Sequence, residues 1–136
     1  MIVVIDCNIF VMCLTSSSPY HEVFQALVNG KFNLAVTADI LLEYEEIIQR
    51  KYSVATAKAF ITLLNELPNV HYAYAYYQWR LITADLDDNK YCDCAVASQS
   101  SYIVTEDKHF DVLKTIPFPS VATIRIDQFL ETLKSV

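Results

Sequence analysis

The sequence predicts an α/β fold in which helices cover both faces of a mostly parallel β-sheet. The first observation is the run at residues 1–10, which is apolar, rich in β-branched side chains and interrupted at Asp6. A run without polar alternation suits the centre of a parallel sheet. The second observation is that apolar segments alternate with amphipathic segments along the chain, which implies right-handed crossovers between parallel strands.

The composition predicts one compact domain spanning residues 1–136. Of the 136 residues, 54% are hydrophobic, so the chain can bury a core without disulfides or a structural metal. Gly30 is the only glycine. A glycine-rich phosphate loop, of the dinucleotide-binding or the P-loop kind, is therefore excluded.

Hydropathy, cysteine content and net charge indicate where the protein is located and which ligands it can bind. No stretch is long and apolar enough to cross a membrane, so we expect a cytoplasmic protein without a membrane partner. In a reducing compartment we expect Cys7, Cys13, Cys92 and Cys94 to be buried thiols. The formal net charge of −6 argues against a nucleic-acid binder, unless the acidic residues gather in one metal-binding cleft.

The first half of the chain supplies the elements that such a sheet requires. After the opening strand at 1–10, polar and helix-breaking residues separate the apolar segments. The predicted elements are a loop at 15–19, a helix at 20–29 ended by Gly30, a strand at 32–36, a helix at 39–51 capped by Thr37 or Asp39, and a helix from 53 to 66.

The second half begins with a strand or strand-like connector at 70–77. The elements predicted after it are a helix at 91–97, a strand at 102–105, a helical turn at 108–113, a loop at 116–119, a strand at 121–126 and a closing helix at 127–134. In and beside the connector, aromatic residues either offer a stacking surface for bases or fill a core or a dimer contact. These residues are Tyr72, Tyr74, Tyr76, Tyr77 and Trp79.

Two of the predicted strands are followed by an aspartate. Asp6 interrupts the opening run. The strand predicted at 102–105 is followed by Glu106 and then by Asp107. A carboxylate at the end of a buried strand is costly to desolvate unless a metal, a base or a proton offsets its charge. Because open α/β sheets bind ligands at their carboxyl edge, we expect Asp6 and Asp107 to share that edge.

Two predicted helices add further carboxylates. Asp85, Asp87 and Asp88 come just before the apolar helix at 91–97. One aspartate would be enough to cap that helix, so the surplus favours a cation between the carboxylates. Glu43 borders the apolar stripe of the helix at 39–51, where its carboxylate can reach a cleft, although helix geometry alone also fits an ordinary boundary glutamate.

A site of this composition is suited to Mg²⁺ or Mn²⁺. Carboxylate oxygens are hard ligands, and no cluster of histidines or thiolates accompanies them. Two such ions stabilise the attacking and leaving oxygens of a phosphoryl displacement, so nucleic-acid hydrolysis is the expected chemistry. His21, His71 and His109 have no identifiable acid–base partner in the sequence, and we interpret them as surface or structural residues.

Four short motifs, in order and covering essentially the whole chain, resemble those of the PIN-domain ribonucleases. They are Asp6-Cys7-Asn8, Leu41-Leu42-Glu43, Asp87-Asp88-Asn89-Lys90-Tyr91 leading into Ala95, and Ile103-Val104-Thr105-Glu106-Asp107 with Phe110. The sequence is most similar to the small single-domain branch that contains the VapC-like toxins of toxin–antitoxin pairs.

The resemblance implies an α/β/α sandwich and a metal-dependent endoribonuclease that hydrolyses RNA with Mg²⁺ or Mn²⁺. Cys7 stands where the family commonly has threonine. In the tandem Asp87-Asp88 we expect Asp88 to be the ligand, because its distance to Ala95 fits the family pattern better, with Asp87 in support. The implied catalytic and metal-binding residues are Asp6, Glu43, Asp88 and Asp107, supported by Asn8 and Thr105.

The same resemblance implies an RNA substrate, a possible cognate antitoxin protein and a homodimer. Lys90 and Lys108 lie close to the acidic motifs. Lysine side chains commonly hold nucleic-acid phosphates, so we expect these two residues to contact the substrate.

Two alternatives stay open. A catalytically inactive PIN-like module would bind RNA or protein without cutting it, although all four acidic positions are filled here. A phosphatase of the haloacid-dehalogenase type would use Asp6 as its nucleophile. That chemistry needs an acid two residues further along, and the chain has Asn8 at this position.

Overall fold

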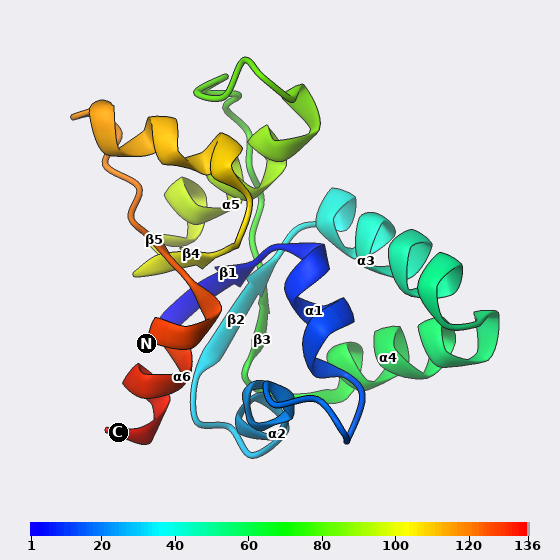
Figure 1. The fold of residues 1–136 in the computed structure, drawn as a ribbon. Coiled ribbons are helices and arrows are strands. Elements are labelled where there is room, and N and C mark those ends of the chain that lie inside the picture. The colour runs from blue at the N-terminus through cyan, green and yellow to red at the C-terminus, as the bar shows by residue number, and fades with distance from the viewer. Residues whose placement is uncertain (136) are drawn as a thin grey trace.

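The computed structural model describes residues 1–135 and contains a five-stranded sheet in which all neighbouring strands are parallel (Figure 1). The prediction of an α/β fold with a parallel sheet is therefore confirmed. The central strand is the opening segment of the chain, whose Val3, Val4 and Ile5 are fully buried. The strands are β1 (Ile2–Ile5), β2 (Asn33–Val36), β3 (Val70–Tyr72), β4 (Tyr102–Val104) and β5 (Thr123–Ile124).

The order of the strands, β3-β2-β1-β4-β5, reverses at the centre of the sheet. From β1 the chain moves outward to β2 and β3, whereas β4 and β5 are added on the other side of β1. Right-handed crossovers then place the helices before β3 on one face and those between β3 and β5 on the other. Ligand crevices in such sheets form at the carboxyl ends of the strands where the order reverses, which here is between β1 and β4.

Apart from α1, which was not predicted, the α-helices begin and end close to the predicted residues. Figure 1 shows α1, α3 and α4 grouped together and away from α5. Gly30 follows α2 with a φ of 73°, a left-handed conformation that glycine adopts without strain. The helices are α1 (Cys7–Cys13), α2 (His21–Val28), α3 (Ala38–Lys51), α4 (Val54–Glu66), α5 (Asn89–Ser98) and α6 (Ile126–Lys134), with two 3₁₀-helices, η1 (Leu86–Asp88) and η2 (Lys108–Thr115).

Side-chain caps fix the starts of the two long helices. The Thr37 hydroxyl oxygen accepts a hydrogen bond from the Ile40 N–H at 3.3 Å, so Thr37 rather than Asp39 caps α3. The Ser53 hydroxyl oxygen accepts one from the Thr56 N–H at 3.0 Å at the start of α4. Each cap satisfies an N–H group that has no partner within the helix.

The opening strand is shorter than predicted, and the prediction of a strand up to residue 10 is wrong. β1 ends at Ile5, and Asp6 then begins α1, where its carboxylate accepts a hydrogen bond from the Asn8 N–H at 3.5 Å. Apolar residues cover so much of this short helix that composition alone does not distinguish it from a buried strand. The buried residues of α1 are Cys7, Ile9, Phe10 and Cys13. The strand predicted at 121–126 is also too long, because Ile126 already begins α6.

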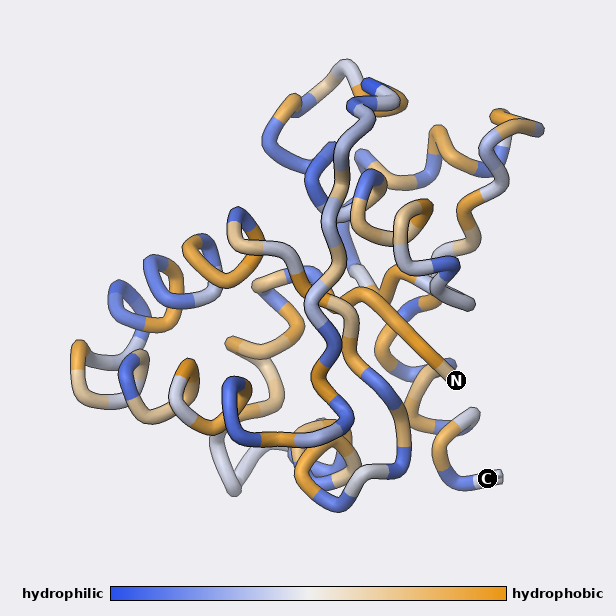
Figure 2. Tube along the Cα trace, turned by 180° about the vertical axis from the view of Figure 1, so that it is seen from behind, coloured by the Kyte–Doolittle hydropathy of each residue, from blue (hydrophilic) through white to orange (hydrophobic). Residues whose placement is uncertain are grey.

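The hydrophobic core joins the sheet to its helices. Phe10 of α1 is fully buried, and its ring centroid lies 5.0 Å from that of Tyr44 in α3 and 4.9 Å from that of Phe60 in α4. In Figure 2 the tube along β1 is apolar, whereas α3 and α4 alternate between apolar and polar residues, as expected for helices with one face on the core. All four cysteines are buried and free, as predicted.

None of the helices described in residues 1–135 is long and apolar enough to span a lipid bilayer.

Candidate functional site

The predicted strand-end carboxylates lie on either side of the reversal in strand order. Asp6 directly follows β1 and caps α1, and Asp107 comes after β4 and caps η2. In each case the side chain accepts a hydrogen bond from an N–H of the first helical turn, from Asn8 at 3.5 Å and from His109 at 2.9 Å. Both carboxylates are therefore fixed at the carboxyl edge of the sheet by the helix that leaves it.

Thr105 connects these two aspartates. Its hydroxyl donates a hydrogen bond to Asp6 Oδ2 at 2.9 Å and accepts one from the Asp107 N–H at 3.0 Å. Thr105 and Asp6 are both buried. Burial raises the pKa of Asp6, and the negative charge of Asp107 raises it further, while the hydrogen bonds from Thr105 and the Asn8 N–H lower it in part.

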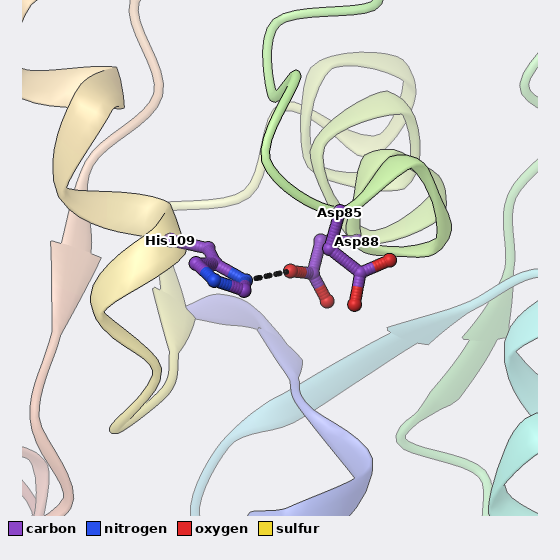
Figure 3. Close-up of side chains that lie close together, drawn as sticks. All are labelled: Asp85, Asp88 and His109. Atoms are coloured by element: carbon purple, nitrogen blue, oxygen red, sulfur yellow. Dashed lines mark hydrogen bonds and ion pairs between the residues drawn. The ribbon is translucent and has the colours of Figure 1, made fainter.

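Asp85, Asp88 and His109 form the one group of three or more candidate metal ligands found among residues 1–135 (Figure 3). One ligand atom of each side chain lies within 4.8 Å of those of the other two. Figure 3 shows the two carboxylates beside η1 and the imidazole of η2 pointing toward one another. His109 Nδ1 is 3.3 Å from Asp88 Oδ2 and 3.5 Å from Asp107 Oδ1, so the imidazole lies between two carboxylates.

The pKa of the Asp88 carboxyl group is raised by burial and by the neighbouring carboxylates. Burial raises its pKa from the ordinary 3.8 to about 6, and the charges of Asp107, Asp85 and Asp6 contribute in the same direction. The hydrogen bond with His109 lowers this pKa only in part. Carboxylates that repel one another in this way are stabilised by a cation placed between them.

Glu43 of α3 has partners of its own. Its Oε2 atom lies 2.8 Å from Lys90 Nζ, and its Oε1 atom accepts a hydrogen bond from the Tyr91 hydroxyl. Burial alone would raise the pKa of Glu43, but the contacts with Lys90 and Tyr91 outweigh it and the pKa is lowered. The Tyr91 hydroxyl also accepts a hydrogen bond from the Cys7 N–H at 3.3 Å. Tyr91 therefore links Glu43 to the residue that follows Asp6.

The donor set at the sheet edge fits a divalent cation. Within residues 1–135, no lysine or arginine side chain pairs with any of the four carboxylates Asp6, Asp85, Asp88 and Asp107. The neighbouring Glu106 instead pairs with Arg125 at 2.9 Å. Oxygen ligands with one imidazole nitrogen suit Mn²⁺, and the carboxylates alone suit Mg²⁺.

The other residues predicted for the site lie around this group. Lys90 is engaged by Glu43, and only 21% of its side chain is exposed, whereas Lys108 is exposed at the start of η2. Asn8 is exposed on α1, and Asp87 is exposed on η1, where its N–H donates to Asp85 Oδ1 at 3.0 Å. Their roles toward a substrate or a metal stay predictions.

Sequence reasoning places Asp85 in the acidic cluster but not among the implied metal ligands, and it misses Tyr91 and His109 as members of the site. The spacing of Asp85 and Asp88 was a usable signal, because residues three apart lie close together in a helical turn. Tyr91 and His109 gave no such signal, since their partners come from distant segments of the chain. The interpretation of His109 as a surface residue agrees with its side-chain exposure of 45%, but it overlooked the contacts with Asp88 and Asp107.

Comparisons with known proteins agree with this geometry. The family model of the PIN domain matches residues 2–109. A search of curated proteins found no match.

Solved structures with the same fold include two toxin–antitoxin proteins. VapBC2 from Rickettsia felis, bound to a DNA fragment from its promoter, has 14% identity and a TM-score of 0.63, with 92% of this chain and 98% of that chain covered. VapBC-1 from nontypeable Haemophilus influenzae has 16% identity and a TM-score of 0.61, with coverage of 93% and 99%. The PIN domain endonuclease Utp24 has 14% identity and a TM-score of 0.54, with coverage of 91% and 84%. At these identities the likeness establishes a shared fold.

Proposed function

The chain belongs to the PIN-domain family, and we propose that it is a divalent-metal-dependent endoribonuclease that acts as the toxin of a toxin–antitoxin pair. The observation that carries the proposal is the set of carboxylates at the carboxyl edge of the sheet. Asp6, Asp85, Asp88 and Asp107 approach one another there without a lysine or arginine partner among residues 1–135. Such a set is suited to Mg²⁺ or Mn²⁺.

The proposed chemistry is hydrolysis of RNA phosphodiester bonds. When bound, divalent cations stabilise the attacking and leaving oxygens of a phosphoryl displacement. The chain itself holds the ligands in place, because Thr105 fixes Asp6 Oδ2 at 2.9 Å and helix caps fix Asp6 and Asp107. Lys90 and Tyr91 hold the Glu43 carboxylate beside the residue that follows Asp6.

The proposed partners follow from the same family. VapBC structures share the fold of this chain, and we propose that this chain also has a cognate antitoxin. RNA is the proposed substrate. A homodimer, a cytoplasmic location and one domain over residues 1–136 stay predictions from the sequence.

The two alternatives are not favoured. A PIN-like module without activity has no need for a cluster of mutually repelling carboxylates, which lowers the stability of the metal-free fold. A phosphatase of the haloacid-dehalogenase type disagrees with the family match over residues 2–109 and with Asn8 in place of its second acid.

An RNA-cleavage assay with the purified protein tests the proposal. We expect cleavage of a single-stranded RNA in Mg²⁺ or Mn²⁺ and none in excess chelator. Asp6→Asn and Asp107→Asn should each reduce the rate at least about 100-fold, because loss of one charged group that supports the transition state costs this much. Asp111→Asn, which changes an exposed aspartate paired with Lys114 at 3.9 Å, is the matched control and should keep the rate.

Cleavage that persists in Asp6→Asn at the rate of the unchanged protein would contradict the proposal. So would the absence of cleavage for all RNAs in both metals when the protein is folded. Trapping of an acyl-phosphate on Asp6 would support the phosphatase instead.

A further inference from the structure

A large open cleft of about 1050 Å³ begins beside the carboxylate site. Its lining includes Glu43, Lys90 and Asp87, which directly precedes Asp88, but none of the four clustered carboxylates, so the cleft borders the site. Its volume is at the upper end of the range of about 300–1,000 Å³ that is usual for small-molecule pockets. A segment of polymer therefore fits it better than one small metabolite.

One wall of the cleft is a long irregular segment. Residues 73–85 connect β3 to η1 without regular secondary structure, and Figures 1 and 2 both show this segment passing the start of α3 before it loops over α5. Irregular segments of this length are uncommon in compact domains, and most of them are either functional loops or linkers. The opposite wall is one face of α3, which contributes Asp39, Leu42 and Glu46.

From this segment Ala73, Ala75 and four large side chains line the cleft. We call the four large residues the cleft wall: Tyr74, Tyr76, Gln78 and Arg80. The two large aromatic side chains between them do not line the cleft: Tyr77 lies against Trp79 with ring centroids 4.6 Å apart. Trp79 in turn contacts Phe118 with ring centroids 5.9 Å apart.

Tyr74 and Tyr76 of the cleft wall are not part of the hydrophobic core. Tyr74 is 70% exposed and Tyr76 is 92% exposed. Of the alternatives that the sequence left open, the filling of the core is therefore wrong for these two residues, and a stacking surface and a dimer contact stay open. Their rings are nearly parallel, with an interplanar angle of 16° and centroids 6.2 Å apart. Exposed aromatic rings in a cleft are platforms on which unpaired bases stack, whatever the sequence of the nucleic acid.

The lining carries five acidic side chains, Asp39, Glu43, Glu46, Asp87 and Asp93, and three basic ones, Arg50, Arg80 and Lys90. The acidic groups favour the amino groups of bases, and only the basic groups can face phosphates. Glu43 and Glu46 are paired with Lys90 and Arg50, at 2.8 Å and 3.0 Å. Asp39 on the α3 wall is exposed, and a carboxylate accepts hydrogen bonds from the amino groups of bases. Arg80 has no ion pair among residues 1–135, and a guanidinium at this position can hold a phosphate of the backbone.

We propose that this cleft is the strand-binding groove of the enzyme and that it takes single-stranded RNA, with two unpaired bases stacked on Tyr74 and Tyr76 and the backbone held by Arg80. The inference rests on the proposed ribonuclease function. Double-stranded RNA is excluded from this mode, because its bases are stacked on one another and present no free face.

RNA binding is measured in the Asp6→Asn variant. Because this variant is expected not to cleave RNA, the measurement reports binding alone. A fluorescein-labelled eight-nucleotide RNA is titrated with the protein in Mg²⁺, and anisotropy gives Kd. Tyr74→Ala combined with Tyr76→Ala should weaken binding at least about tenfold, whereas the two Tyr→Phe changes should retain it, because the ring provides the stacking. Tyr72→Ala is the matched control, since Tyr72 belongs to the same part of the chain, is 49% exposed and does not line the cleft.

The same pair of alanine changes in the active protein should raise KM about tenfold with little change in kcat, because the groove holds RNA away from the reacting bond. Arg80→Ala should weaken binding and reduce its dependence on salt. An equal Kd for the double alanine variant and the Tyr72→Ala control would overturn the proposal while leaving the nuclease intact. Tighter binding of a duplex RNA than of the single strand would overturn the proposal as well. So would a double alanine variant that loses affinity for an octa-arginine peptide but binds RNA with an unchanged Kd.

If the active protein cleaves no RNA, the proposed function fails. The anisotropy measurement still decides whether the groove binds RNA, so the two failures are distinguishable.

Discussion

Among individual residues, Asp88 shows how the fold changes the chemistry of a carboxyl group. Its pKa of about 6 reflects burial and three neighbouring aspartates. Between about pH 4 and pH 6 the folded protein therefore binds a proton at Asp88 that the unfolded chain has lost. The stability of the metal-free protein must fall as the pH rises through this window, because the charged form is disfavoured only in the fold.

Asp88→Asn removes this unfavourable charge without changing the shape of the side chain. We expect the variant to have a higher Tm than the unchanged protein at pH 7.5 in chelator, and nearly the same Tm at pH 4, where the Asp88 carboxyl of the folded protein is uncharged. Thermal unfolding followed by circular dichroism measures the difference. An equal or lower Tm for Asp88→Asn at pH 7.5 would contradict this account of the site, and Asp111→Asn provides the control for a remote charge.

Single residues also mark the limit of sequence-based prediction for the site. Asp6 and Asp107 could be predicted, because each follows an apolar strand and parallel strands end at a common edge. The pairing of Lys90 with Glu43 could not, since it depends on how closely α3 and α5 pack. The contacts of His109 with Asp88 and Asp107 likewise depend on the path of η2.

Among the elements, the two long helices α3 and α4 were predicted best. Thr37 and Ser53 mark the starts of α3 and α4 in the sequence and in the structure. Helix α1 was missed, because its seven residues are too few for a clear helical period and its buried residues continue the apolar run of β1. The sequence nevertheless contained its start signal in Asp6, which we interpreted only as a candidate ligand.

The packing of α1 can be tested through Phe10, which contacts Tyr44 of α3 and Phe60 of α4. Phe10→Ala should lower the free energy of unfolding by about 3–5 kcal/mol, because it opens a cavity where three elements meet. Urea unfolding measures this change. Val54→Ala is the control, since Val54 is 49% exposed, and its effect should be small. Equal losses in the two variants would show that α1 does not contribute to the core as described.

For the whole molecule, an acidic chain is proposed to act on RNA, which is itself an acidic polymer. Taken alone, the net charge of −6 argues against an RNA substrate. The fold gathers Asp6, Asp85, Asp88 and Asp107 at one edge of the sheet. Cations bound there can neutralise these carboxylates and so reduce their repulsion of RNA phosphates. The strand order, which reverses between β1 and β4, brings these residues together from three segments of the chain.

We propose that the carboxyl edge of the sheet beside Asp6, Asp88 and Asp107 is a divalent metal centre. The most direct test is a crystal of the protein soaked in Mn²⁺ and measured for anomalous scattering. We expect a Mn²⁺ peak at bonding distance from Asp88 and from Asp6 or Asp107, and we expect it to disappear in Asp88→Asn. A fully soaked crystal without a peak at this edge, or with Mn²⁺ bound only elsewhere on the molecule, would contradict the account.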